Sequence, residues 1–185
     1  ANAPDTCFGF IWDPTTTAQA HAAGAGATID VSLGGFTDAL HGAPIAATAY
    51  VKSLTDGRFK LVNPMGAGST VELGPMARLI IGNVDVLVGS RRSQTLDAQL
   101  FLLHGIDVRT MRIVALKSQQ HFRGGFQDIA GTIIRADTPG FTTSDLSLLP
   151  FRNIRRPIWP LDPLPGRQAW LHWSEPQPPS SNSDA

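Results

Sequence analysis

Short apolar runs separated by glycine-rich turns fill the first half of the chain. Runs of this length and alternation predict β-strands. They lie at residues 7–12, 28–33, 45–54, 58–62, 76–81 and 84–88. Thr55-Asp56-Gly57 has the composition of a hairpin turn and joins the third run to the fourth, and Gly82-Asn83 joins the last two. We therefore expect an antiparallel, meander-like region in the middle of the chain.

One helix is predicted directly after the first strand. Asp13 is a favourable N-cap residue, and Pro14 suits the first position of a helix. Residues 15–23 are rich in alanine, the strongest helix former. Gly24 then favours the end of the helix, because glycine readily adopts the conformation that follows the last turn.

From residue 84 onward the pattern changes to strand, loop, helix and strand. We predict helices over residues 96–104 and 119–130, and strands over residues 112–116 and 132–135. Ser118 would cap the second helix, and Phe122, Phe126 and Ile129 would form one apolar stripe on it. Such an alternation implies crossovers and some parallel pairing. The predicted fold class is α/β to α+β: a mixed β-sheet domain with an antiparallel meander region followed by βαβ-like crossovers.

The length of 185 residues suits one domain with a sizeable core. We place this domain at residues 1–165. Residues 166–185 are polar and rich in proline and serine, so we expect them to form a disordered tail.

The charge balance excludes some classes of partner. Lys and Arg number 15, as do Asp and Glu, so the net charge is zero and no field would attract nucleic acid. No apolar run approaches the roughly 20 residues of a membrane span. We expect neither nucleic acid nor a membrane as partner. Cys7 is the single cysteine, which excludes an internal disulfide. With no signal-peptide pattern at the start, this composition indicates a cytoplasmic protein.

Catalytic motifs with a recognisable spacing are absent from the sequence. The five histidines are His21, His41, His104, His121 and His172, and no two are close together. A catalytic zinc needs clustered His and carboxylate ligands, so we expect no metal ligands on this chain. There is also no Gly-x-Ser-x-Gly segment, which leaves a serine hydrolase without support.

The purified 185-residue chain is accordingly expected to bind no zinc tightly and to hydrolyse no peptide. The reason is the lack of three clustered ligands in the sequence. Elemental analysis of a well-washed sample measures this directly, and near-stoichiometric zinc would contradict it.

The segment 117–122 combines groups that suit a binding or catalytic site. The preceding strand would deliver Lys117 to the carboxyl end of the sheet, where open α/β sheets bind ligands. Ser118 would open a helix whose first N–H groups favour anions. His121 would lie in the first turn, able to face a cleft. The alternative is that Ser118 is only a cap, Lys117 is solvated and His121 is a surface residue.

Two further polar loops follow apolar strands. Arg91 and Arg92 belong to the segment 90–94, and Asp137 begins the segment 137–140. All three loops could line one crevice at the same edge of the sheet. The alternatives are a solvated turn for the two arginines and a tight chain connection for Asp137.

A series of short motifs resembles the C-terminal domain of MlrC-type proteins, the microcystin-degradation family. The motifs are Ile11-Trp12-Asp13-Pro14, Ala23-Gly24-Ala25-Gly26, Leu33-Gly34-Gly35, His41-Gly42-Ala43-Pro44, Asp56-Gly57, Leu73-Gly74, Gly105-Ile106-Asp107, Lys117-Ser118-Gln119-Gln120-His121-Phe122-Arg123, Asp137-Thr138-Pro139-Gly140 and Arg155-Arg156-Pro157-Ile158-Trp159-Pro160-Leu161-Asp162. Each motif is weak alone. Their shared order over roughly residues 8 to 162 makes the resemblance specific.

The resemblance implies a zinc-dependent metallopeptidase or amidase-like hydrolase that acts on a peptide-like small substrate. Its zinc ligands lie in an N-terminal metal-binding domain of the same or another polypeptide, so zinc is implied for the full-length family and none for this chain. This domain would contribute substrate-binding or oxyanion-stabilising residues to a shared cleft. The candidate catalytic residues are Lys117 and His121, and the candidate substrate-binding residues are Ser118, Arg91, Arg92 and Asp137. Whether the protein forms a homo-oligomer is left open.

The alternative is a non-catalytic assembly or small-anion-binding module without hydrolase activity. An observation that would distinguish the two functions is whether the coding sequence continues upstream of Ala1 into a domain rich in Asp and His.

Overall fold

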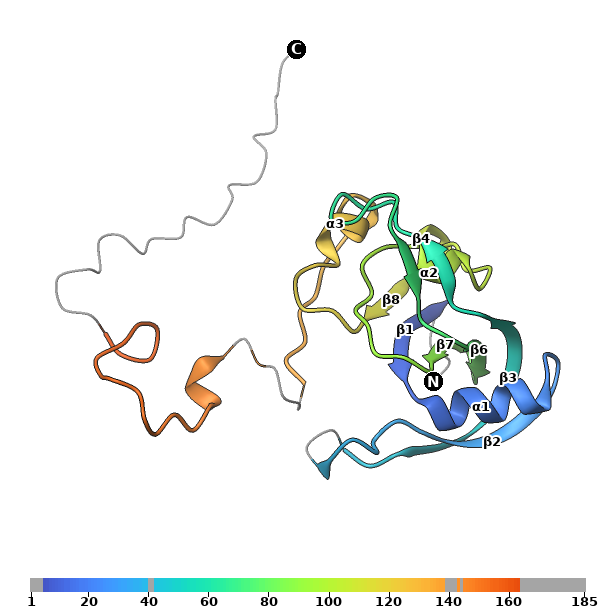
Figure 1. Cartoon of the computed structure of the whole chain (residues 1–185), viewed down its shortest axis with the longest axis horizontal. Coiled ribbons are helices and arrows are strands. Elements are labelled where there is room, and N and C mark those ends of the chain that lie inside the picture. Colours follow the sequence, from blue (N-terminus) through green and yellow to red (C-terminus); the bar gives the residue numbers. More distant parts are fainter. Residues whose placement is uncertain (1–4, 40–41, 139–142, 144, 164–185) are drawn as a thin grey trace, which may run out of the picture. The chain divides into compact units, whose positions relative to one another are not determined.

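The computed structural model describes residues 5–39, 42–138, 143 and 145–163, and divides the chain into two compact units, Ala1–Ala136 and Asp137–Ala185 (Figure 1). All strands among the described residues belong to the first unit. Among the described residues, no helix has the length and apolar character that crossing a membrane requires. The predicted domain boundary at residue 165 lies outside the described residues and stays a prediction.

A six-stranded mixed sheet forms the first unit. Its strands in chain order are β1 (Thr6–Trp12), β2 (Thr28–Leu33), β3 (Ile45–Thr55), β6 (Met76–Ile81), β7 (Val84–Gly89) and β8 (Ile113–Leu116). The order across the sheet is β2-β3-β6-β7-β1-β8. The first four strands of this order pair antiparallel, whereas β1 pairs parallel to both β7 and β8. The predicted fold class, an antiparallel region followed by crossovers, is therefore confirmed.

The turn after β1 follows the prediction from the sequence. The helix α1 (Pro14–Ala23) begins after Asp13, whose carboxylate accepts hydrogen bonds from the backbone N and the hydroxyl of Thr16, both at 2.8 Å. The same carboxylate accepts from Gly34 N at 3.0 Å, so it also holds the end of β2 beside this helix. Gly24, with a φ of 86°, ends the helix.

One of the two predicted hairpins is present. β6 and β7 pair across Gly82-Asn83, with Ile81 opposite Val84. The other hairpin prediction is wrong, because β3 pairs with β2 and β6, and β4 (Arg58–Lys60) pairs with β5 (Thr70–Glu72) in a separate two-stranded sheet. Since Leu54 and Thr55 continue the β3–β6 ladder, the chain leaves the main sheet at Gly57 instead of turning back along β3.

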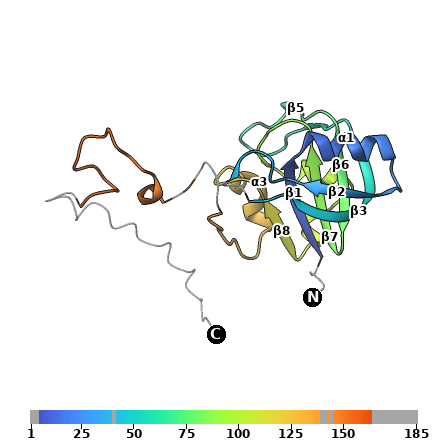
Figure 2. The same ribbon diagram turned by 90° about the horizontal axis from the view of Figure 1, so that it is seen from below.

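Alternation along the central strands divides the core between the two faces of the sheet. On β6, Met76 packs in one cluster and Ala77 in the other; on β7, Leu87 and Val88 divide in the same way. The first cluster contains Leu100 and Phe101 of α2 (Gln99–Leu102), Phe126 of α3 (Arg123–Phe126) and the preceding Phe122, and the second contains Ala20 of α1. Both views place α3 at the β8 end of the sheet and α1 toward the β2–β3 end (Figure 1 and Figure 2).

A buried polar network joins the sheet to the segment after α2. Arg78 donates to both carboxylate oxygens of Asp85, at 2.7 and 2.9 Å, and to the carbonyl of His104 at 3.1 Å. The His104 ring lies against the hydroxyls of Ser53 and Thr55, at 3.1 and 3.3 Å. Burial and the nearby Arg78 cation lower the pKa of His104 to about 4. The ring is therefore neutral near pH 7 and acts as part of the core.

The two later helices are much shorter than predicted. α2 covers Gln99–Leu102 instead of 96–104, and α3 covers Arg123–Phe126, followed by a 3₁₀ turn, instead of 119–130. The residue before α3 is Phe122, without a side-chain cap, so the prediction that Ser118 caps a helix is wrong. Glycine disfavours helix interiors, and a side chain at Gly125 would lie 2.5 Å from the Leu96 carbonyl oxygen. The backbone at Gly125 therefore packs closely against residues 96 and 97.

The predicted apolar stripe and the last predicted strand are only partly present. Phe122 and Phe126 are buried, but Ile129 is 44% exposed. Residues 132–135 form no strand; Ile133 packs against the core, whereas Ile134 is 86% exposed. The strand prediction is wrong because β8 pairs with β1, and this segment joins neither of them in a ladder.

Candidate functional site

Three parallel strands end at the same edge of the sheet and position the candidate site. β7, β1 and β8 are adjacent and parallel, and they end at Gly89, Trp12 and Leu116. The segments 90–94 and 117–121 follow β7 and β8 directly, so both leave the carboxyl edge. This is the edge at which open α/β sheets form ligand sites.

Gly9 in β1 holds both of these segments. Its carbonyl oxygen accepts a hydrogen bond from the hydroxyl of Thr95 at 2.7 Å and from the backbone N of Lys117 at 3.2 Å. The pairing register of β1 with β7 shifts between Phe8 and Ile11, which places Gly9 at an irregularity of the strand. One irregularity in the central parallel strand thus holds the end of the 90–94 loop, at Thr95, and the beginning of the 117–121 loop, at Lys117.

His121 joins the two loops. Its ring is exposed, and Nδ1 lies 2.8 Å from Oε1 of Gln94. An amide oxygen only accepts, so Nδ1 donates in this contact. His121 is thus exposed beside another polar group of this edge, which fits both the cleft residue and the surface residue that the sequence left open. Gln94 was not singled out from the sequence, where only its place in a polar loop pointed to it.

The two residues between β8 and His121 differ in their surroundings. Lys117 is exposed and presents its ammonium group to solvent. Ser118 is half-buried, and its hydroxyl oxygen is fully enclosed with no hydrogen-bond partner among the described residues. In this conformation the Ser118 hydroxyl does not reach the surface, so a substrate-binding role requires the loop to turn it outward.

Arg91 and Arg92 add positive charge to the same edge. The Arg92 guanidinium lies 3.9 Å from the centroid of the Trp12 ring, a cation–π distance. The indole N–H of Trp12 donates to the carbonyl of Ser90 at 3.1 Å and thereby fixes the orientation of the Trp12 ring. Arg91 donates to the Glu72 carbonyl at 3.4 Å. The segments 90–94 and 117–121 together contain three cationic side chains and no acid.

Asp137 belongs to the second unit. Its carboxylate accepts a hydrogen bond from the Thr143 hydroxyl at 3.1 Å. Residues 139 and 140 of the same predicted loop lie outside the described residues. The prediction that this loop shares a crevice with the other two therefore stays a prediction.

The described residues do not form a metal centre. No three His, Cys, Asp or Glu side chains gather as ligands within the described part of the chain. His21 contacts the Met76 carbonyl at 3.0 Å, and His104 belongs to the buried network. His41 and His172 lie outside the described residues. These side chains do not fit a zinc ion.

Burial makes Cys7 unreactive as a nucleophile. It is fully buried in β1, and burial, followed by the nearby Asp85 carboxylate, raises the pKa of its thiol to about 12. A thiol with this pKa stays protonated near pH 7 and behaves as a small apolar side chain.

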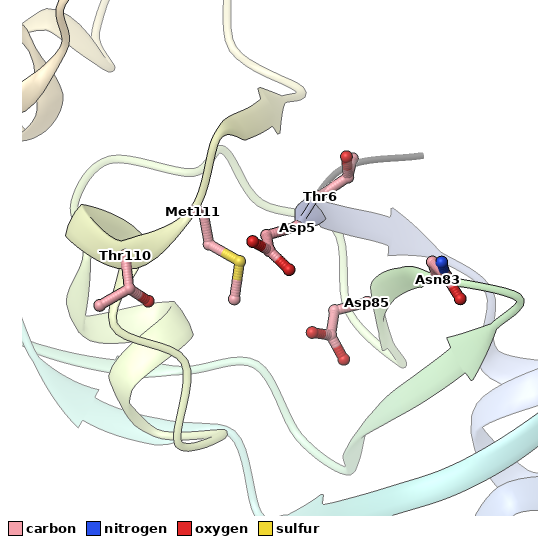
Figure 3. Close-up of a pocket in the computed structure, with 6 residues that line it drawn as sticks. All are labelled: Asp5, Thr6, Asn83, Asp85, Thr110 and Met111. Atoms are coloured by element: carbon pink, nitrogen blue, oxygen red, sulfur yellow. The ribbon is translucent and has the colours of Figure 1, made fainter. Parts of the chain in front are cut away.

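A separate pocket of about 310 Å³ lies at the opposite, amino edge of the parallel strands. It is lined by Asp5, Thr6, Asn83, Asp85, Thr110 and Met111, and we call it the Asp5–Met111 pocket. Figure 3 shows Met111 and the carboxylates of Asp5 and Asp85 lining one open space. The pocket was not predicted from the sequence, since its residues come from three segments that lie far apart in the chain.

Comparison with known proteins places the chain in one family. The sequence model described as MlrC C-terminus matches residues 1–153. Microcystinase C from Sphingomonas sp is 26% identical over 159 residues, which cover 86% of this chain and 30% of that protein. The crystal structure of a Mesorhizobium sp. BNC1 protein named "Putative metallopeptidase" superposes with a TM-score of 0.73 at 28% identity, covering 87% of this chain and 32% of that one. This chain thus spans about a third of the length of these relatives, and it belongs to the MlrC C-terminal domain family.

Proposed function

We propose that this domain supplies one wall of the substrate cleft in a zinc-dependent peptidase or amidase-like hydrolase. The observation that carries the proposal is the contact between His121 and Gln94, which joins two cationic loops at the carboxyl edge of the parallel strands. The remaining wall and the metal would come from an N-terminal domain of the same or another polypeptide. Support for such a domain comes from the relatives, since this chain spans only 30% and 32% of their lengths.

The chemistry of the edge suits a negatively charged group of a peptide-like substrate. Lys117, Arg91 and Arg92 are exposed cations, and no acid lies in their two loops. A peptide carboxylate, or the oxyanion that forms when an amide carbonyl is attacked, would be stabilised by such donors. Nε2 of His121 could form a hydrogen bond with the substrate, because Gln94 fixes the orientation of the ring. None of these roles requires a metal ligand from this chain.

We expect His121→Ala to lower turnover at least about tenfold in a two-domain protein that contains this domain. The zinc content and the melting temperature should stay nearly unchanged, because the ring is exposed and its hydrogen bond among the described residues is to a side chain. Steady-state kinetics on a peptide substrate measures the effect. Lys117→Ala should mainly raise KM, since a cation that binds a substrate carboxylate contributes to binding in the ground state.

Arg112→Ala is the matched control, because Arg112 is an exposed cation at the amino end of β8, away from the site. It should leave kcat and KM unchanged. If His121→Ala and Lys117→Ala behave like this control, the edge takes no part in catalysis, and a non-catalytic assembly or small-anion-binding module remains as the function.

A further inference from the structure

An aromatic surface lies at the carboxyl end of β1, beside the candidate site. The rings of Trp12 and Phe36 are tilted by 49° to each other, with their centroids 5.1 Å apart. Arg92 covers part of the Trp12 ring, and its guanidinium carbon lies 3.9 Å from the ring centroid. Phe36 is 46% exposed and Arg92 is exposed, whereas Trp12 is half-buried. We call these three side chains the aromatic platform.

The backbone before Phe36 holds its ring in this position. The buried Asp13 carboxylate, which caps α1, also accepts a hydrogen bond from Gly34 N at 3.0 Å. Gly35 has a φ of 64°, and a Cβ there would lie 2.4 Å from the backbone N of Pro44, so the chain folds back closely on itself at this point. Phe36 is therefore positioned before any ligand arrives, which reduces the entropy lost on binding.

One loop joins the aromatic platform to the candidate site. In the segment 90–94, Arg92 contacts Trp12, and Gln94, two residues later, contacts His121. Arg92 donates no hydrogen bond to any described residue and forms no ion pair with one. A guanidinium that lies over a ring keeps N–H donors at its edges, and these suit a carboxylate. One ligand could thus contact an aromatic ring and a cation at the same time.

We propose that the aromatic platform binds an aromatic side chain of the substrate, while Arg92 donates to a carboxylate beside it. Aromatic rings pack favourably on one another beyond the area that they bury, so the platform would select aromatic over small side chains. The absence of acids from the segments 90–94 and 117–121 suits the negative charge of such a substrate. The inference rests on the proposed function, because it places the platform in the same cleft as His121.

NMR titration of the isotope-labelled 185-residue chain with N-acetyl-L-phenylalanine tests the platform without requiring activity. The indole N–H signal of Trp12, assigned by its loss in Trp12→Phe, reports binding. This compound should bind at least about tenfold more tightly than N-acetyl-L-alanine, which lacks the ring, and than N-acetyl-L-phenylalanine amide, which lacks the carboxylate. Equal Kd values for the three compounds, or no shift of the signal with any of them, would overturn the proposal.

Two variants separate the contribution of the ring from that of the cation. Phe36→Ala should remove most of the preference for N-acetyl-L-phenylalanine over N-acetyl-L-alanine, and Arg92→Ala should remove most of its preference over the amide. The matched controls are Tyr50→Ala and Arg112→Ala. Tyr50 is 40% exposed and pairs with Thr28, at the other end of β2 from the platform, and Arg112 is exposed at the amino end of β8. Both controls should keep the wild-type Kd values, and a Phe36→Ala chain that keeps the full preference would contradict the assignment.

Kinetics of the two-domain protein distinguish a failure of this inference from a failure of the proposed function. Two peptides are compared that carry either phenylalanine or alanine beside a free carboxylate. Phe36→Ala should lower kcat/KM at least about tenfold for the phenylalanine peptide alone, whereas His121→Ala should lower it equally for both. If only His121→Ala has its effect, the platform assignment is wrong and the proposed function stands. If His121→Ala has no effect, the proposed function is wrong, and the NMR titration still decides whether the platform binds aromatic carboxylates.

Discussion

Replacing Gly9 with alanine is expected to lower the free energy of unfolding by about 3 kcal/mol, the upper range for forcing extra atoms into a packed core. A Cβ at this position would overlap Cζ of Phe101 and lie 2.9 Å from both of its Cε atoms. Phe101 is fully buried and packs edge-on against Phe126, so its ring has little room to move. Chemical denaturation of the wild-type and Gly9→Ala chains measures the difference.

The same substitution should also disturb the candidate site. Because the Gly9 carbonyl holds Thr95 and Lys117, a displaced β1 would loosen both loops, and the Lys117 amide should exchange its hydrogen faster. Gly131→Ala is the matched control, since a Cβ there would meet no atom within 4 Å. Its stability should change by less than about 0.5 kcal/mol. Equal stability of the Gly9 and Gly131 variants would show that Phe101 does not restrict Gly9.

Asp97→Ala is expected to cost about 3 to 5 kcal/mol of unfolding free energy. The Asp97 side chain is 2% exposed and accepts hydrogen bonds from three backbone N–H groups, those of Val62, Asn63 and Gln99, at 2.8, 3.1 and 2.9 Å. Each buried donor that loses its partner costs about 1–3 kcal/mol. Urea denaturation followed by circular dichroism measures the loss.

Two controls separate this effect from the loss of a charge. Asp97→Asn keeps one side-chain oxygen as an acceptor and should lose roughly half as much stability. Asp56→Ala removes an exposed aspartate that accepts one hydrogen bond, from Arg58 N at 3.0 Å, and should cost less than about 1 kcal/mol. If Asp97→Ala were as mild as Asp56→Ala, the turn at residues 62–63 would not depend on the Asp97 carboxylate.

The contacts of Asp97 also explain why the helix over 96–104 could not be predicted correctly. The sequence predicted a helix over residues 96–104, and Thr95 and Asp97 lie at its expected start. In the structure both side chains are buried and bind backbone groups far away in the chain, of Gly9 and of Val62 and Asn63. These long-range hydrogen bonds hold the segment out of the helix until Gln99, and periodicity within the segment carries no information about them.

The candidate site was likewise predictable only in part from the sequence. The sequence indicated Lys117, His121, Arg91 and Arg92 because polar loops after apolar strands lie at the carboxyl edge of a parallel sheet. It could not indicate Gln94 as the partner of His121, since the two are 27 residues apart and meet only because β7 and β8 flank β1. Nor could it indicate that the Ser118 hydroxyl is enclosed.

The sequence by itself determined the local elements: the strands of the main sheet, the helix α1 with its Asp13 cap, and the turn at Gly82-Asn83. These depend on interactions within a few residues, and side-chain types report them directly. Only the tertiary structure decided that β3 pairs with β6, that the later helices are short, and which loops share an edge. Those outcomes depend on backbone groups that find partners far along the chain, and a single sequence does not record which partner each group finds.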